Sequence, residues 1–409
     1  MPHVIHIVRK FEPAEWGGTE THLVALIREL NALGWTNEVH APQEHGTDGS
    51  SLVSAGAAFR TFRARYPYLR MTPERRAALV AAGGNLVSMD ELARLLFNRD
   101  AHVLHLHTLG RLGGVARTAA RMRGIPYAVT LHGPVRAHAD VVQGDAVRRT
   151  HGMVDVGAPF GLAVGARRVV HDADLVYVLN QAERNAWAKD RGERHLEVVS
   201  HGVTLERSTA VARQDARSSV AGLGEAPFLV VIARLDRGKG QDVAVRAFLR
   251  SAPPDWHLVL AGSVSDTTFA AEVQTLAAAQ HDRIHLLGGV TPRIARALLA
   301  EAHLALIPSR SEPFGIVLLE AWAEGTPALI ADVGGLGDIA RRTGATDWLA
   351  SSGDEDAWSE RIRRVAGEGD DVVQERSRVR DRVAAHFSWR KLAERIAAGY
   401  EQARALRQR

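Results

Sequence analysis

Short runs of consecutive apolar residues alternate with amphipathic helical patterns along the first half of the chain. The runs predict strands buried on both faces, at 3–8, 102–107, 127–132, 175–180 and 196–202. Between 17 and 34 leucine and isoleucine recur every three or four positions and the pattern closes at Gly34, which predicts a helix. Such alternation predicts a parallel sheet with right-handed connections.

The alternation starts again in the second half, after a polar stretch at 204–225 that we interpret as a linker. Strands are predicted there at 228–235, 256–262, 283–289, 303–308 and 327–331, and an amphipathic tail helix at 387–409. Two Rossmann-like, doubly wound domains fit this order better than one large sheet.

The predicted boundaries are 1–204 for an N-terminal domain and 205–387 for a C-terminal domain, with the tail helix 388–409 crossing back to the N-terminal domain. Ligands of open α/β sheets bind beyond the carboxyl ends of the strands. We therefore expect the two domains to face a central cleft.

Composition supports a folded two-domain protein. The 409 residues suit two domains, and 46% hydrophobic with 24% charged residues is typical of a soluble chain. No apolar run approaches the ~20 residues of a membrane-spanning helix, and the N-terminus does not resemble a secretory signal. The absence of cysteine excludes disulfides, thiolate nucleophiles and cysteine-bound zinc. A cytoplasmic enzyme is expected.

Charge narrows the partners. The net charge of +4 comes from nearly balanced acids and bases, so we expect no nucleic-acid partner. The segment 60–76 mixes arginine with aromatic residues and is interpreted as a solvated loop, the alternatives being contact with an anionic membrane surface or an acidic acceptor. The oligomeric state is left open.

A glycine-flanked lysine follows the first strand of the second half. Arg234 and Lys239 stand five positions apart in "ARLDRGKGQD", between a predicted strand and a helical pattern. The glycines let the backbone approach a ligand, the helix start offers N–H donors, and two cations can clamp a diphosphate. A solvated basic turn is the alternative. The Gly-Lys-Ser/Thr of a Walker loop is absent.

Two glutamates frame a mostly apolar stretch from 310 to 338. Glu312 precedes a predicted helix, Gly315 lies in its first turn, and Glu320 follows about one and a half turns later. Glu320 could accept hydrogen bonds from vicinal hydroxyls and Glu312 from a second set of hydroxyls. The alternative is a helix-start glutamate plus an exposed one, although the flanking "GIVLLEA" looks fully buried.

These motifs, with several others, resemble the retaining GT-B glycosyltransferases of glycosyltransferase family 4. In family order they are "GGTE" at 17–20, "LHG" at 131–133, "HGV" at 201–203, the "ARL…KG" loop, "EPFGIVLLE", "GTP" at 325–327 and "GG" at 334–335. The resemblance implies transfer of a sugar from a UDP- or GDP-sugar to an acceptor, such as a small natural product or a glycoconjugate intermediate. It implies no obligatory cofactor and no metal.

The resemblance also implies roles for single residues. Arg234 and Lys239 are similar to the diphosphate clamp, Glu312 to the residue that holds the donor sugar, and His132 to the histidine beside the reacting centre. Glu320 resembles the ribose acceptor. Further donor-binding positions are Gly17, Gly18, Gly262, Val290, Phe314, Gly315, Ile316 and Val317. Weaker acceptor candidates are His107, Arg136, His138 and Asp140. The chain departs from the family pattern at 201–204, at Asp338 and after Gly262.

Alternatives remain at this stage. His105 and His107 share one face of a predicted strand and could bind a metal, but no carboxylate accompanies them at ligand spacing, and we expect no metal. A nucleotide-sugar epimerase or a phosphorylase on the same fold is one rival function. A catalytically silent GT-B protein that binds a sugar nucleotide is another.

Overall fold

The computed structural model describes residues 1–11, 18–45, 48–81, 85–133, 153–192, 195–367 and 369–408. The chain forms two compact units, Met1–Ser200 with Trp389–Arg409, and His201–Ser388. In the described ranges no helix is long and apolar enough to cross a membrane.

The first unit is built on a seven-stranded sheet in the order β3-β2-β1-β5-β6-β8-β9, in which all neighbours are parallel. Its strands are β1 (His3–Ile7), β2 (Thr36–Pro42), β3 (Ala57–Phe62), β5 (Val103–Leu106), β6 (Tyr127–Leu131), β8 (Leu175–Val178) and β9 (Leu196–Val198). β4 (Tyr68–Leu69) and β7 (Val154–Asp155) form a separate antiparallel pair. The strand order reverses between β1 and β5, as in doubly wound folds.

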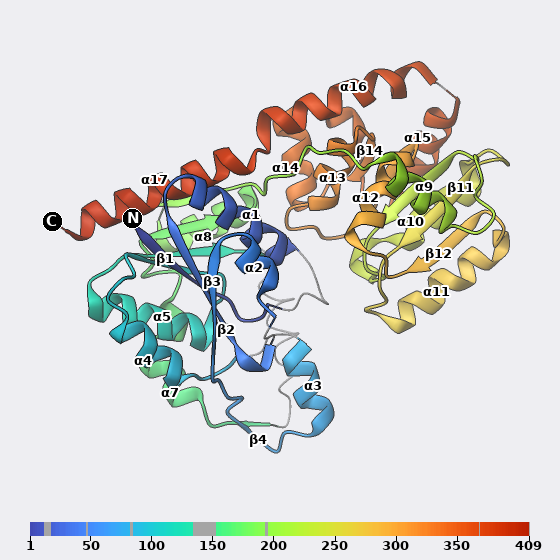
Figure 1. The fold of residues 1–409 in the computed structure, drawn as a ribbon. Helices are drawn as coiled ribbons and strands as arrows, with labels where there is room; N and C mark the ends of the chain where they lie inside the picture. Colours follow the sequence, from blue (N-terminus) through green and yellow to red (C-terminus); the bar gives the residue numbers. More distant parts are fainter. Residues whose placement is uncertain are drawn as a thin grey trace. The chain divides into compact units, whose positions relative to one another are not determined.

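Helices cover both faces of this sheet (Figure 1). The helices of the first unit are α1 (Gly18–Ala32), α2 (Ser50–Ser54), α3 (Pro73–Ala81), α4 (Met89–Phe97), α5 (Gly110–Arg123), α7 (Ala158–Ala163), α8 (Gln181–Arg191) and α17 (Trp389–Arg407). Neighbouring strand residues point to opposite faces: Ile5 joins the apolar layer under α5, whereas Val4 joins the layer under α1 and α17. The chain's last helix therefore completes the core of the first unit, where Tyr400 is fully buried.

The second unit repeats the order with six parallel strands, β12-β11-β10-β13-β14-β15. The strands are β10 (Phe228–Ile232), β11 (His257–Ala261), β12 (Ile284–Gly288), β13 (Leu304–Ile307), β14 (Ala328–Ala331) and β15 (Leu349–Ala350). The helices are α9 (Ala210–Ser218), α10 (Gln241–Ser251), α11 (Thr267–Ala277), α12 (Pro292–Glu301), α13 (Ile316–Glu324), α14 (Gly334–Thr343), α15 (Glu355–Gly367) and α16 (Gly369–His386). The order reverses between β10 and β13. The prediction of two parallel, doubly wound sheets is confirmed.

Two strands of the first sheet, β2 and β3, were not predicted from apolar runs. β2 carries Asn37, Glu38 and His40, all buried, so its sequence does not read as a buried strand. These side chains are hydrogen-bonded: His40 to Glu38 and Glu91 at 2.9 and 2.7 Å, and Asn37 to His6 and Asn31 at 3.0 and 2.9 Å. A strand with internally paired polar groups can be buried without being apolar.

Two stretches read as irregular are partly ordered into elements. The interpretation of 60–76 as a loop is wrong in part, because it contains the end of β3, strand β4 and the start of α3. Arg60 pairs with Glu38 there. The polar stretch 204–225 contains α9, which Thr209 caps and whose Ala212 and Ala216 are buried. Small residues hid its apolar face.

Candidate functional site

The candidate donor site lies at the point where the strand order of the second unit reverses. The loops that follow the adjacent strands β10 and β13 carry Lys239 and Glu312. The Lys239 Nζ lies 2.7 Å from Glu312 Oε2, with side-chain exposures of 25% and 15%. The structure thus brings together two predicted site residues 73 positions apart, and their ion pair was not predicted.

Local hydrogen bonds hold the Lys239 loop in place. The Asp236 carboxylate accepts the Gly238 N–H at 2.8 Å and caps the short 3-10 helix Arg237–Lys239. Gly240 has φ +69, and a Cβ there would clash with the Pro308 carbonyl. Only glycine allows this approach of the two loops, so the Gly-Lys-Gly sequence positions the lysine beside the end of β13.

A second ion pair joins the loop after β13 to the first turn of α10. Arg310 donates to both carboxylate oxygens of Asp242 at 2.8 Å, and its backbone N–H donates to the Gly238 carbonyl at 2.8 Å. Burial opposes ionisation of Asp242, but the Arg310 hydrogen bonds hold its pKa below the usual value. The Arg310–Asp242 ion pair was not predicted from the sequence. The signal was an acid in the first turn of the helix after the lysine loop.

Arg234 differs from the other basic residues of its loop. Its guanidinium is exposed and has no acidic partner in the described part of the second unit, while its carbonyl accepts from Gln241 Nε2 at 2.7 Å. Arg237 instead pairs with Glu272 at 2.6 Å. Arg234 therefore keeps a cation available to an anionic ligand.

Two helices begin beside Glu312. α13 starts after Gly315, whose φ is +99, and α14 starts at Gly334. The Gly335 N–H donates to the Glu312 carbonyl at 2.9 Å, and a Cβ at Gly335 would clash with the backbone of Phe314. First-turn N–H groups and helix dipoles favour anions at such ends. The "GG" of the sequence is thus a packing requirement of this arrangement.

Glu320 lies on α13 and is half-buried. Burial raises its pKa to about 7, with Arg296 opposing and Glu324 adding to the rise. Its carboxylate has no hydrogen-bond partner within the described residues of the second unit. Glu324, one turn later, is saturated by Arg296 at 2.6 Å and by Ser208 at 3.0 and 3.1 Å.

The other donor-site candidates have mixed surroundings. Phe314 is buried against the ring of His201, with centroids 4.9 Å apart. Ile316 and Val317 are only half-buried, so the expectation that the residues flanking Glu320 are fully buried is wrong at these two positions. A Cβ at Gly262 would clash with the Ala233 carbonyl at the end of β10, which explains this glycine structurally.

Val290 is half-buried and follows Gly289, the residue after the end of β12. Gly17, Arg136, His138 and Asp140 lie outside the described residues, and Gly18 is the first residue of α1. Their roles stay predictions.

In the first unit, His132 joins a chain of histidines at the carboxyl edge of the sheet. Its Nε2 lies 2.8 Å from His107 Nδ1, and His107 Nε2 lies 3.1 Å from His6 Nδ1. Burial lowers the pKa of His6 to about 4, that of His132 to about 3 and that of His107 well below its usual value. The rings are therefore neutral at neutral pH. Sequence reasoning missed His6, although a histidine inside a buried strand was a signal.

His6, His105 and His107 also present ring nitrogens within 4.8 Å of one another, close enough to suggest a metal site. Both nitrogens of each ring are already hydrogen-bonded, however; those of His105 bond to Thr130 at 2.7 Å and to Tyr400. A metal would have to displace these bonds. The expectation that no metal is needed stays a prediction.

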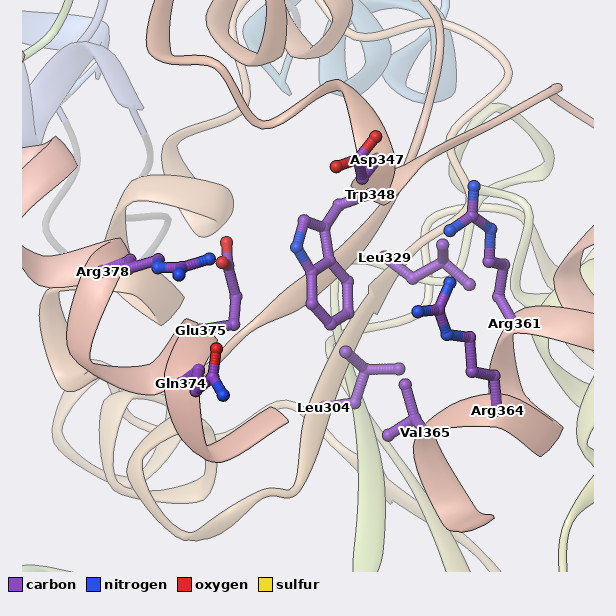
Figure 2. Close-up of a pocket in the computed structure, with 10 residues that line it drawn as sticks. All are labelled: Leu304, Leu329, Asp347, Trp348, Arg361, Arg364, Val365, Gln374, Glu375 and Arg378. Carbon is purple, nitrogen blue, oxygen red and sulfur yellow. The ribbon is translucent and has the colours of Figure 1, made fainter. Parts of the chain in front are cut away.

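A cavity of about 330 Å³ lies elsewhere in the second unit (Figure 2). Leu304, the first residue of β13, lines it together with Trp348 and three arginines, whereas the candidate site lies beyond the last residue of β13. None of the predicted site residues lines this cavity. This cavity therefore does not mark the candidate site.

Comparison with known families agrees with this geometry. Residues 16–207 match the model described as Glycosyltransferase Family 4, and residues 213–382 match the model described as Glycosyl transferases group 1. The chain therefore contains a Glycosyltransferase Family 4 domain followed by a Glycosyl transferases group 1 domain. The predicted fold is confirmed, and both matched models are of glycosyltransferase domains.

Individual relatives carry related names. A D-inositol 3-phosphate glycosyltransferase of Mycolicibacterium gilvum is 30% identical over 263 residues, covering 61% of this chain and 56% of the relative. One of Corynebacterium diphtheriae is 24% identical over 411 residues, covering 95% and 91%. The chain spans little more than half the length of several such relatives.

Solved structures share the fold at low identity. HepE of Anabaena, solved with UDP and glucose, has a TM-score of 0.74 and 17% identity over 98% of this chain and 100% of its own. Sucrose-phosphate synthase of Thermosynechococcus elongatus has a TM-score of 0.71 and 19% identity over 99% and 100%.

Proposed function

We propose that the chain transfers a sugar from a nucleotide-diphosphate sugar to an acceptor, with retention of the anomeric configuration. The observation that carries the proposal is the meeting of Lys239 and Glu312 between two helix N-termini. Arg234, which has no acidic partner among the described residues of the second unit, lies on the same loop as the lysine. Positive charge, N–H donors and a carboxylate at one edge suit a ligand that has phosphates next to hydroxyls.

Each side chain then has a chemical task. Arg234 and Lys239 hold the diphosphate; a lysine has three donors, so Lys239 can keep Glu312 while it binds phosphate oxygens. Glu312 accepts from hydroxyls of the donor sugar. Glu320, whose carboxylate has no hydrogen-bond partner in the part of the second unit that the structure describes, accepts from the ribose hydroxyls. In the first unit, His132 is assigned to the reacting sugar on the resemblance stated above.

The bond changes follow from retention. The bond between the anomeric carbon and the phosphate oxygen breaks, and the acceptor oxygen bonds to that carbon on the same face. The acceptor proton passes to the leaving diphosphate. Arg234, Lys239 and the starts of α13 and α14 stabilise the negative charge that develops there.

The substrates are proposed from the relatives. HepE is solved with UDP and with UDP-glucose, which supports a UDP-sugar over a GDP-sugar as donor. The names of the sequence relatives make D-inositol 3-phosphate the first acceptor to test, beside small glycoconjugate intermediates.

A product assay tests the proposal. The protein is incubated with UDP-, GDP- or ADP-sugars, with and without D-inositol 3-phosphate, and products are identified by mass spectrometry and NMR. We expect an acceptor-dependent glycoside with the donor's anomeric configuration, and none from Lys239→Ala. An epimerised sugar nucleotide without acceptor, or a sugar phosphate formed only with free phosphate, would replace the proposal with an epimerase or a phosphorylase. Donor binding without any turnover would indicate a silent protein.

A further inference from the structure

We propose that Asn37, His6 and His107 form a hydrogen-bond relay that fixes the tautomer of His132, with the proton on Nε2 and Nδ1 left as the accepting nitrogen. These three are positioning residues. What Nδ1 accepts rests on the proposed function, whereas the relay is a property of the protein without substrate.

Adjacent parallel strands bring the relay together. His6 lies in β1, His107 directly follows β5 and His132 directly follows β6, and β5 pairs with both β1 and β6. The links are 3.0 Å from His6 Nε2 to Asn37 Oδ1, 3.1 Å from His6 Nδ1 to His107 Nε2, and 2.8 Å from His107 Nδ1 to His132 Nε2.

Two backbone carbonyls determine which atoms donate and which accept in the relay. Asn31 Nδ2 donates to the Ala55 carbonyl at 2.9 Å, so Asn31 turns its Oδ1 to Asn37. Asn37 Nδ2 donates to that oxygen at 2.9 Å and to the Trp35 carbonyl at 3.3 Å. A flip of either amide would place two oxygens against each other. Asn37 Oδ1 must therefore accept, and His6 Nε2 must carry a proton.

The direction passes from ring to ring because each ring is neutral. A neutral imidazole has one N–H and one bare nitrogen. With the proton on Nε2, His6 offers a bare Nδ1, which accepts from His107 Nε2–H. His107 then offers a bare Nδ1, which accepts from His132 Nε2–H. All three rings share the Nε2–H tautomer, and His132 is left with Nδ1 as an acceptor.

The consequence concerns the hydroxyl that His132 meets. A bare Nδ1 accepts a hydrogen bond from a substrate hydroxyl, whereas an Nδ1–H would instead need an acceptor there. A tautomer fixed before binding spares the protein a proton rearrangement when substrate arrives. The relay thus gives the buried histidines a task that their packing alone does not explain.

Two-bond ¹H–¹⁵N spectra of the full chain labelled with ¹⁵N-histidine show which ring nitrogen bears the proton. The His132 signals are identified by their loss in His132→Gln. We expect a single Nε2–H form in the wild type. Asn37→Leu removes the acceptor that fixes the proton on His6 Nε2, so the Nδ1–H form of His132 becomes populated.

A matched control and a second variant keep the test decisive. His105 lies with its ring centroid 4.3 Å from that of His107 but outside the relay, so His105→Gln leaves the His132 tautomer unchanged. If Asn37→Leu does not fold, Asn37→Ser replaces it in the test. A hydroxyl can donate or accept, so it no longer forces the proton onto His6 Nε2. The expected result there is a mixture of tautomers.

Kinetics give the second readout. An equal mixture of tautomers would lower kcat/KM about twofold, in proportion to the competent fraction. Mixed tautomers in the wild type, an unchanged His132 in both Asn37→Leu and Asn37→Ser, or a stoichiometric metal in the purified protein would overturn the relay. The expected spectra without any sugar transfer would support the relay and overturn only the proposed function.

Discussion

The two units place different chemistry at the same edge of similar sheets. In the first unit His6, His107 and His132 are neutral and bonded to one another. In the second unit Arg234 is exposed without an acidic partner in the described residues, and Lys239 has one ion pair beside two helix N-termini. At the edge of the first sheet, these histidines hydrogen-bond to one another. The edge of the second sheet leaves charge and N–H groups for a ligand, which shows that strand order alone does not decide what an edge binds.

The largest effect is expected from substitutions that remove a positive charge from the candidate site of the second unit. Arg234→Ala and Lys239→Ala should each weaken donor binding by about 10- to 150-fold, because a charged hydrogen bond is worth about 1.5–3 kcal/mol. Turnover should fall as well. Calorimetric titration with UDP-sugar measures the affinity.

Arg237→Ala is the matched control, because Arg237 stands in the same loop but is paired with Glu272. It should bind donor as the wild type does. Equal losses in all three variants would show that only the general positive charge of the loop matters.

The two glutamates should separate by kinetic parameter. Glu312→Gln should lower kcat about tenfold or more at saturating donor, because the donor sugar changes shape and charge in the transition state. Glu320→Gln should mainly raise KM, since the ribose is held alike throughout. Steady-state kinetics at saturating acceptor measure both. Wild-type kcat in both variants would remove Glu312 from the reacting sugar.

The pKa of Glu320 predicts a pH dependence of donor affinity. Burial raises this pKa to about 7, so the carboxylate that accepts from ribose is lost as pH falls through that value. The Kd for a UDP-sugar should rise by up to about tenfold per pH unit below it. A UDP-sugar is the right probe, because its diphosphate does not titrate there. Glu320→Gln should flatten the profile, and an unchanged slope in that variant would assign the titration to another group.

His40, also in the first unit, differs from the neutral rings of His6, His107 and His132 because it is protonated at neutral pH. Burial opposes its protonation, but hydrogen bonds to Glu38 and Glu91 raise its pKa to about 9, with Arg60 and His3 also facing Glu38. A raised folded-state pKa gives stability that is complete below the unfolded value of 6.5 and lost as pH rises through about 9. The lost free energy of unfolding is up to roughly 3 kcal/mol.

Hydrogen exchange of β2 peptides, compared at each pH with His40→Gln, measures this loss. The difference between the two proteins should shrink across that window. A constant difference would mean that His40 is neutral in the folded protein.

Much of the second unit could be predicted from sequence because its signals are local. In each of the two loops, the strand end, the glycines and the charged residue are close in sequence, as around Lys239 and around Glu312. Their mutual ion pair could not be predicted, because it depends on the pairing of β10 with β13. The histidine chain was out of reach for the same reason. His6, His107 and His132 lie on three strands, and only the sheet register brings them together.

Calorimetric titration of the full chain with UDP-glucose, GDP-mannose and ADP-glucose tests the central claim most directly. The account predicts that at least one of them, the UDP-sugar first, binds one to one, and that Lys239→Ala weakens that binding while Arg237→Ala does not. No binding of any sugar nucleotide at millimolar concentration, or binding that Lys239→Ala leaves unchanged, would contradict a donor site at the loops after β10 and β13.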